Sequence, residues 1–379
     1  MTTNYPTQAR SYAQLAYLGA IDLALGESAT VPDNAFECAR AAGFAYTKTS
    51  TTSGWINPSS HAQSSGLDCL MSDIITDLLT NVQYGMGSSA GDIGGSVTQF
   101  ATYQRAQGLF FSPLVNSQEK ATEIIDRWAI LSNSWIYWSG AQYQFVPLGD
   151  SAITGNGVTY TPQTDVAYDL GFDDFLAASG KDEGPVKVTR IDPADAHNRS
   201  SLSITDRTLG YIDNPFEWKD DGLVSQYGLR DDSSTQADEI CDPAVARIVV
   251  QLIGKRAAYI RNSYAFKTSG KYILCLPGTI LTLTEPNIGL NKVRVRVKTV
   301  SEDEKDNLSF VCEEFPGNVG TYYAPNGTAA ISTATTPVNN TPPGNVNTPA
   351  VIEPNSAFTG GVLLTGVVAV LIAAVPFGA

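Results

Sequence analysis

Residues 248–315 decide the fold, and they read IVVQLIGKRAAYIRNSYAFKTSGKYILCLPGTILTLTEPNIGLNKVRVRVKTVSEDEKDNLSFVCEEF. A segment of helical period ends near Asn262, and the apolar pattern after it predicts four short strands: Ser263–Lys267, Leu281–Thr284, Val293–Val300 and Leu308–Glu314. Turn-forming residues separate the four strands from one another: Pro277-Gly278, Pro286-Asn287 and the charged run Glu302–Asn307.

The third of these strands alternates apolar and basic side chains. One face takes Val293, Val295, Val297 and Thr299, while the other takes Arg294, Arg296 and Lys298. Successive side chains of a strand point to opposite faces, so this pattern predicts a half-buried antiparallel strand with its basic face in solvent.

Composition limits the possible functions. The 379 residues allow two to three domains with substantial cores. Only 16% of the residues are charged, which suits a subunit that hides its surface in an assembly but also fits an isolated enzyme. The net charge of −14 argues against nucleic acid as a ligand, because phosphate contacts need clustered Lys and Arg. An acidic lumen still lets DNA pass unbound.

No residue set for catalysis, a cofactor or a metal stands out. His61 and His197 both lie in predicted turns, and neither accompanies a nucleophile motif. The five cysteines lack metal-ligand spacing, so we expect reduced and mostly buried thiols: Cys38, Cys69, Cys241, Cys275 and Cys312. We therefore predict a protein that is not an enzyme, although a carboxylate pair among its 38 acidic residues stays possible.

Ahead of the opening stretch, the clearest helix is Leu67–Asn81, with Asp68, Asp73 and Asp77 on its wet face. A glycine-rich loop and a short helix follow at Gly85–Gly95 and Val97–Gln107. Ser117 is the expected cap of the next helix, which carries an i, i+4 pair of Glu123 and Arg127. An aromatic hairpin comes next, formed by Trp135–Trp138 and Gln142–Val146.

The remaining segments have less distinct patterns. We expect a polar bridge at Pro147–Gly184 and two strands at Val186–Asp192 and Ser201–Asp206. An exposed acidic and aromatic arm is expected at Asp213–Asp232, and a long helix at Ala237–Arg261. Near the N-terminus, Ala13–Leu25 and Asp33–Ala45 have helical character, and Thr47–Ser65 is an expected loop.

The C-terminal part differs from the rest in composition. Gly317–Pro354 is rich in Asn, Thr, Pro and Gly, and predicts a flexible linker unless a neighbour grips it. From Ala357 to Phe377 the chain has no charge and is just long enough to span a bilayer as a helix. No basic residue flanks this run, so its topology cannot be assigned.

The order of these parts resembles the phage tail-tip and baseplate hub family, which includes putative phage tail proteins and tail-tip attachment proteins. The resemblance rests on colinear blocks covering roughly three quarters of the chain. Its matching residues are Ser72–Gly85, Glu119–Pro147, Arg190, Asn198, Asp206-Arg207, Tyr211, Tyr227–Arg230, Arg261–Tyr264, Leu276–Thr279, Leu281–Thr284 and Gly289-Leu290.

The resemblance implies an α+β chain with β-rich, tube-like hub domains and a helical and hairpin insert. The expected divisions are an N-terminal part of the tube-like domain (residues 1–66), the insert (67–150) and a bridge (151–185). A second tube-like domain with the long helix (186–316), the linker (317–355) and the apolar segment (356–379) follow. Some members of the family carry extra cell-wall-cutting domains; no spare segment of this sequence is long enough for one, so we do not expect that activity from the resemblance.

By the same resemblance, the chain is a structural virion protein. Three copies form a hub that closes the distal end of the tail tube, connects it to tip or fibre proteins and serves host attachment and DNA ejection. The implied partners are the tail tube or distal tail protein, the tape-measure protein and tail fibre or tip proteins. No signal peptide is visible, so synthesis in the host cytoplasm is expected before assembly at the virion tail tip.

Two questions stay open at this point. The apolar run from Ala357 to Phe377 either packs in the trimer and plugs the tube, or contacts the host membrane during DNA delivery. The same run also fits a different class of protein, a tail-anchored bacterial envelope protein with a β-rich soluble domain.

Overall fold

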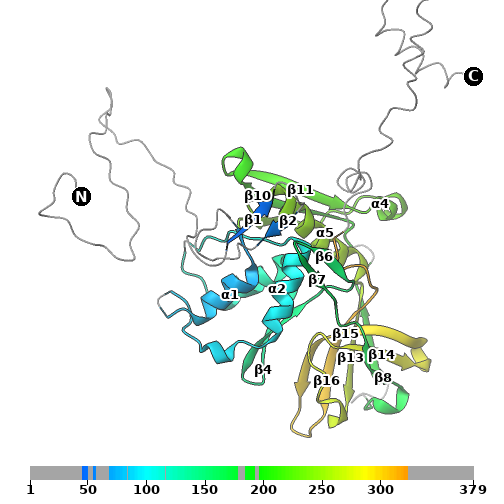
Figure 1. Cartoon of the computed structure of the whole chain (residues 1–379). Helices are drawn as coiled ribbons and strands as arrows, with labels where there is room; N and C mark the ends of the chain where they lie inside the picture. Colours follow the sequence, from blue (N-terminus) through cyan, green and yellow to red (C-terminus); the bar gives the residue numbers. More distant parts are fainter. Residues whose placement is uncertain are drawn as a thin grey trace, which may run out of the picture. The chain divides into compact units, whose positions relative to one another are not determined.

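The computed structural model describes residues 45–49, 54–56, 68–82, 84–115, 117–177, 184–192 and 196–322. All of them belong to one compact unit, residues 40–379. Helices and sheets build two hydrophobic cores in this part of the chain (Figure 1). The predicted α+β class is confirmed in this coarse form, while the tube-like character and the domain divisions stay predictions.

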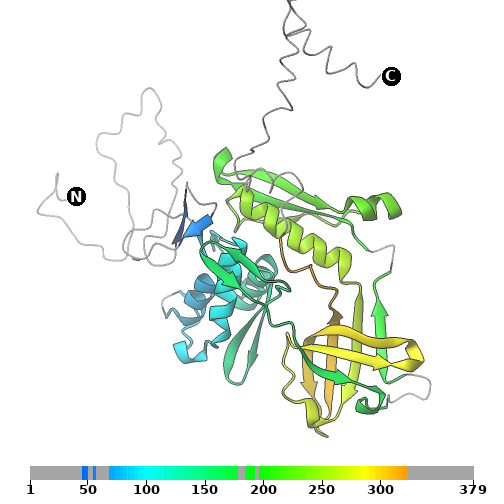
Figure 2. The same ribbon diagram turned by 45° about the vertical axis from the view of Figure 1, so that its right-hand side comes forward.

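The largest sheet has six strands in the order β8-β14-β15-β16-β13-β9 (Figures 1 and 2). Its strands are β8 (Val166–Leu170), β14 (Ile280–Glu285), β15 (Leu290–Glu302), β16 (Leu308–Glu314), β13 (Asn262–Thr268) and β9 (Val186–Arg190). All neighbours pair antiparallel except β14 and β8, which are parallel. Short 3₁₀ turns stand at Gly270–Tyr272 and Pro286–Ile288. The four strands predicted from residues 263–314 are thus confirmed.

One face of this sheet is packed with apolar side chains. Phe266 on β13 is directly opposite Phe310 on β16, and their rings stack with centroids 5.4 Å apart. The core also contains Tyr264, Leu281, Leu283, Val295, Val297 and Cys312. A register shift between Val297 and Thr299 interrupts the alternation, so Thr299 is exposed. Such a bulge adds one residue to a strand and reverses the facing of those beyond it.

The basic face of β15 is not uniformly wet, contrary to the prediction. Arg294 and Lys298 are exposed, but Arg296 between them is only 5% exposed. Burial lowers the pKa of Arg296. The sequence pattern identified the two faces correctly but assigned to solvent a face that a second layer of the protein covers.

The second core gathers around three helices. These are α1 (Met71–Thr80), α2 (Ser96–Gln107) and α3 (Ala121–Leu131). Two hairpins accompany them: β4 (Ser134–Ser139) with β5 (Gln142–Pro147), and β6 (Ile153–Gly155) with β7 (Val158–Tyr160). Helix α2 ends at Gly108 in the left-handed conformation (φ 83°), which glycine adopts without strain.

Three local predictions in this region are wrong. Lys120, not Ser117, precedes the first turn of α3, and the Ser117 hydroxyl donates to Glu119 instead. Arg127 pairs with Glu119 and Glu239, whereas Glu123 pairs with Lys120. The segment Pro147–Gly184 is not only a bridge of turns, because it contains the β6–β7 hairpin and β8. These strands are only three to five residues long, which is too short to show a clear period.

Helix α5 (Pro243–Tyr259) lies along a three-stranded sheet ordered β11-β10-β12 (Figure 2). The strands are β11 (Ile212–Lys219), β10 (Arg199–Asp206) and β12 (Thr235–Ala237). Asp242 caps the helix by accepting from the Ala244 amide, so it begins six residues after the predicted Ala237. A Cβ at Gly254 would lie 2.1 Å from the Trp218 ring, so glycine permits the close approach of β11.

The expected exposed arm, Asp213–Asp232, is therefore wrong in part. It forms β11, which pairs along its whole length with β10, and helix α4 (Asp221–Tyr227). Phe216 and Trp218 pack against the core with α5. The alternation of these aromatic residues with charged ones was the signal of a half-buried strand that composition alone concealed.

Asp68 also differs from its prediction, because it lies in a strand rather than on a wet helix face. Strand β3 (Asp68–Cys69) pairs with β1 (Ala45–Thr49), and β1 pairs with β2 (Gly54–Ile56). Most of β1 and all of β2 lie in the segment Thr47–Ser65, which was predicted to be a loop. The Asp68 carboxylate is 1% exposed and accepts from Arg207 and Ser112. Burial alone would lower the pKa of Arg207, but the bonds to Asp68 raise the pKa of Arg207 overall.

Several predicted features lie outside the described residues. They are Cys38, His61, the segments Ala13–Leu25 and Asp33–Ala45 apart from Ala45 itself, the linker beyond residue 322, and the run from Ala357 to Phe377. Among the residues that are described, no helix is both long enough and apolar enough to cross a membrane.

The Asp68–Arg207 pair gives a first prediction. Asp68→Asn removes the charge that compensates Arg207, and removal of one partner from a buried pair is strongly destabilising. We expect the free energy of unfolding to fall by about 3 kcal/mol, measured by urea denaturation. Asp126→Asn, on the exposed side of α3, is the control and should change stability by less than about 0.5 kcal/mol. Equal effects of the two variants would contradict the assignment.

Candidate functional site: a buried polar junction and its pocket

Residues 317–322 follow the closing strand β16 and are fixed to the rest of the unit by Asp150. The amide of Gly320 donates to Asp150 Oδ2 at 2.9 Å, and the amide of Val319 donates to the same oxygen. The Thr321 hydroxyl donates to Asp150 Oδ1 at 3.3 Å. A carboxylate that accepts several hydrogen bonds holds a peptide segment firmly, since bonds to charged groups are the stronger ones.

Two side chains grip the same segment through its carbonyl groups. Tyr103 Oη donates to the Gly320 oxygen at 2.8 Å, and it accepts from Asn133 Nδ2 at 2.7 Å. Lys255 Nζ donates to the Thr321 oxygen at 2.9 Å. Burial raises the pKa of Tyr103 and lowers the pKa of Lys255 to about 8. The first six residues of the predicted linker are therefore part of the folded body.

Two arginines complete this polar junction. Arg256 on α5 donates to Glu313 Oε2 on β16 at 2.8 Å. Arg296 lies beside Glu313 in register on β15, but it forms no ion pair in the described part of the chain. Its one hydrogen bond is a long one of 3.4 Å from Nη1 to the Leu148 oxygen. Its guanidinium also lies over the Phe315 ring, 4.6 Å from the centroid.

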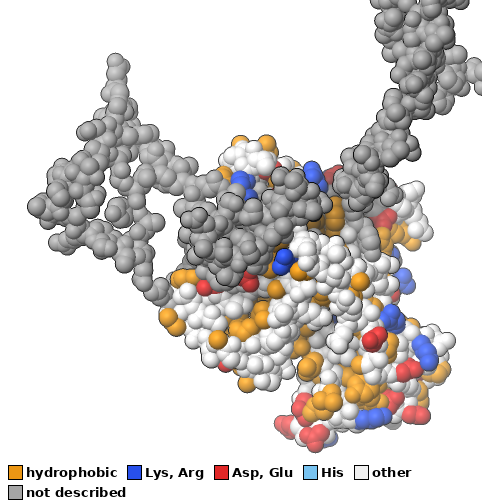
Figure 3. Space-filling view, viewed as in Figure 1, with side chains coloured by type: hydrophobic (Ala, Val, Ile, Leu, Met, Phe, Trp, Pro, Cys, Tyr) orange, Lys and Arg blue, Asp and Glu red, His pale blue; other side chains and the backbone are white. Residues whose placement is uncertain are grey.

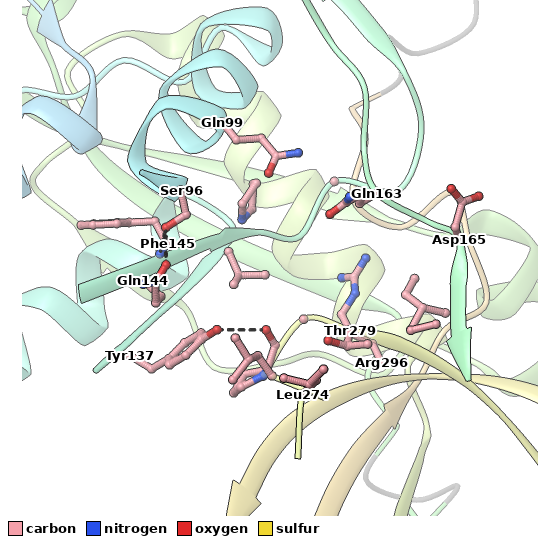
Figure 4. Close-up of a pocket in the computed structure, with 18 of the residues that line it drawn as sticks. Ser96, Gln99, Tyr137, Gln144, Phe145, Gln163, Asp165, Leu274, Thr279 and Arg296 are labelled. Carbon is pink, nitrogen blue, oxygen red and sulfur yellow. Dashed lines mark hydrogen bonds between the residues drawn. The ribbon is translucent and has the colours of Figure 1, made fainter. Parts of the chain in front are cut away.

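A cavity of about 510 Å³ opens beside Arg296 (Figure 4). Its walls come from α2, the β4–β5 hairpin, the segment before β8, and the loop between Tyr272 and β14. Tyr137 Oη donates to the Pro277 oxygen at 3.3 Å across one side. Three amide side chains line the cavity, Gln99, Gln144 and Gln163, and Asp165 stands at its edge. A pocket with convergent polar groups over an apolar wall is suited to binding.

The residues that the sequence singled out include one histidine and four cysteines in the described part of the chain. His197 Nδ1 lies 2.8 Å from the Asp231 oxygen, and its side chain is 37% exposed. Cys241, Cys275 and Cys312 are free and buried, and Cys69 is buried, so the predicted burial is confirmed for these four. Burial raises the pKa of Cys241, and that of Cys275 to about 11, so these thiols stay protonated near neutral pH. No metal-binding group of His, Cys, Asp or Glu occurs among the described side chains.

The sequence predicted no site residues, so the junction was missed as a site. Asp150, Lys255 and Arg296 come from three distant segments, and each looks like an ordinary charged residue in its own segment. Lys255 gave a weak signal, because it falls within the most apolar stretch of α5. A charged residue in such a place is usually paired or functional.

Removal of the carboxylate at position 150 tests the junction. Asp150→Ala removes the carboxylate that accepts from the amides of Val319 and Gly320. It also removes the negative charge near the cation of Lys255. We expect a loss of about 3 kcal/mol in the free energy of unfolding, and faster proteolysis just after residue 322. Asp165→Ala, at the exposed edge of the pocket, is the matched control. If both variants unfold at the same denaturant concentration, Asp150 does not hold the segment.

Lys255 gives a pH dependence with a defined sign. In the unfolded chain a lysine titrates at about pH 10.4, whereas burial lowers the folded pKa to about 8. The destabilising effect of its charge is complete below pH 8 and is relieved as the pH rises toward 10. Between pH 7 and 9.5, wild type should gain about 2 kcal/mol in unfolding free energy relative to Lys255→Met. Denaturation at several pH values measures this difference, and a flat one would count against the burial of this charge.

Comparison with known proteins finds one family model that matches part of the chain. Residues 120–300 match the family model described as putative phage tail protein. Similar solved structures include the virion of a native gene transfer agent particle, with 19% identity over 45% of this chain and 36% of that chain and a TM-score of 0.35. No curated protein is significantly similar.

Two prophage or bacterial tail proteins are also similar. The 43 kDa tail protein of prophage MuSo2 from Shewanella oneidensis shares 14% identity over 54% of this chain and 56% of that one, with a TM-score of 0.35. The tail protein from Neisseria meningitidis MC58 shares 8% identity over 56% and 60%, with a TM-score of 0.38. The chain thus spans about a third to three fifths of these structures. Residues 120–300, just under half of the chain, thus resemble the putative phage tail proteins, the resemblance that the order of the sequence blocks predicted.

Proposed function

We propose that this chain is a structural subunit of a phage tail, and that three copies form the hub closing the distal end of the tail tube. The family match over residues 120–300 is the observation that carries the proposal. The described residues add no nucleophile, base or metal group that favours an enzyme instead. The ring, its position at the tail tip and its role in DNA delivery are the proposed part.

The edges of the six-stranded sheet support assembly with other copies. Strand β9 forms one edge, and Val188 on it is 41% exposed. Ile191 just beyond β9 and Val166 on the opposite edge strand, β8, are also exposed. Edge strands present unpaired amides and carbonyls, and apolar side chains on them favour pairing with another strand. A closed ring of subunits removes such edges.

The charge of the chain fits a passage for DNA. With 38 acidic and 24 basic residues, an internal surface of this chain repels phosphate more than it binds it. In this proposal the partners are the tail tube or distal tail protein above, the tape-measure protein inside and the fibre or tip proteins outside. The chain is made in the host cytoplasm and acts in the virion, with Ala357 to Phe377 as plug or membrane contact.

Molar mass in solution tests the proposal. Light scattering of the full chain should give three times the subunit mass at micromolar concentration. Val188→Lys places a charge on the edge strand and should raise the concentration for half-association about tenfold. Thr299→Lys, an equally exposed β-branched residue on the internal strand β15, should leave it unchanged.

A different outcome points to another function. If the chain stays monomeric and extraction from cells requires detergent, the tail-anchored envelope protein is favoured over the hub. If Val188→Lys and Thr299→Lys weaken association equally, the trimer does not use the β9 edge.

A further inference from the structure

Arg296 is the feature of the pocket that calls for a ligand. Its side chain is almost fully buried, and its one hydrogen bond is the long bond to Leu148, beside the ring of Phe315. Glu313 and Asp150 attract it through their charges, but Glu313 is bonded to Arg256 and Asp150 accepts from residues 319–321. A guanidinium has five N–H donors, and donors of a buried cation left without an acceptor are costly. A carboxylate entering the pocket would satisfy it.

The rest of the pocket has the character of a protein-binding site. Gln99, Gln144 and Gln163 offer amide donors and acceptors, which match the backbone of an entering chain. The loop on one side exposes Leu274 (77%) and Leu276, which is unusual for such large apolar side chains. Asp165 at the edge makes no ion pair with any described residue. The site thus combines a buried positive charge, an apolar wall and a negative charge at its edge.

The chain itself carries a segment of complementary charge. The turn between β15 and β16 contains Glu302, Asp303, Glu304, Lys305 and Asp306. Asp303 fixes this turn, since its Oδ1 accepts from the amides of Lys305 at 2.9 Å and Asn307 at 3.0 Å. Glu304 and Lys305 are exposed and form no ion pair within the described part of the chain. Acidic side chains gather at the lower end of the face shown in Figure 3.

This turn cannot fill the pocket of its own subunit. Arg296 and the turn belong to the same β15–β16 hairpin, and Glu302 is six positions beyond Arg296 along the strand. At the rise of an extended strand, this is about 20 Å along the sheet. Hydrogen bonds to β14 and β16 hold the strand in place, so the turn is directed away from the pocket.

We propose that the β15–β16 turn of one copy enters the pocket of a second copy, with Glu304 directed to Arg296 and Lys305 to Asp165. The contact is heterologous, because turn and pocket are different surfaces, and repetition of a heterologous contact closes a ring when the rotation permits it. This inference rests on the proposed hub, for which it names the subunit contact. The reciprocal order of charges, Glu304-Lys305 against Arg296 and Asp165, also fixes the direction of insertion.

Exchange of the charges of Lys305 on the turn and Asp165 at the edge of the pocket, together the rim charges, tests the contact while Arg296 stays unchanged. Lys305→Glu and Asp165→Lys should each raise the concentration for half-association about tenfold, and the double variant should restore it to within about threefold of wild type. Both side chains are exposed, so folding should survive. Glu304→Gln should also weaken association about tenfold, whereas Glu302→Gln, exposed beside the same turn, should not.

A crosslink provides a second measurement. Gln163→Cys combined with Lys305→Cys should give a covalent trimer on a non-reducing gel, since the two positions meet only between copies. Gln163→Cys combined with Asp221→Cys, in exposed α4, is the control and should stay uncrosslinked. A wild-type trimer without this crosslink, and without any response to the rim charges, overturns the inference and leaves the hub intact. A full chain that is monomeric at every concentration overturns both.

Discussion

The burial of charged groups at the junction of Asp150, Lys255 and Arg296 is the constraint on which the rest of the structure depends. Each of these groups loses hydration, which is costly unless partners replace the water. Asp150 is satisfied by the amides of residues 319 and 320, and Lys255 by the carbonyl of residue 321. The segment after the closing strand therefore cannot leave without exposing two unmatched charges to an apolar interior.

This constraint connects elements that sequence order keeps apart. Asp150 follows the β4–β5 hairpin, Lys255 is on α5 and Arg296 is on β15. Hydrogen bonds from Tyr103 and Lys255 and to Asp150 thus fix residues 317–322, the stretch that follows β16 of the six-stranded sheet, to the side of the molecule that contains α2 and α5.

The sequence predicted those elements whose pattern depends only on their own residues. Strands β13 to β16 follow from alternation and turn residues, most of α1 follows from a helical period, and α2 ends at Gly108 as the sequence predicted. The errors arise where another segment decides. Arg296 is buried because a second layer covers its face, and Asp68 because Arg207, 139 residues away, compensates it. No local pattern contains that information, which is why the junction, the pocket and the short strand β8 were missed.

The distribution of charge explains why assembly of such a chain needs specific contacts. Copies that each carry a net charge of −14 repel one another at low ionic strength. The junction buries two of the basic side chains, Lys255 and Arg296, and partly buries Arg256, which leaves the surface still more acidic. Apolar sheet edges supply attraction that salt does not screen, but they do not select one orientation. In the contact proposed above, a correctly placed carboxylate of a second copy would reach the buried cation of Arg296, which lines an open pocket, and this would select the orientation.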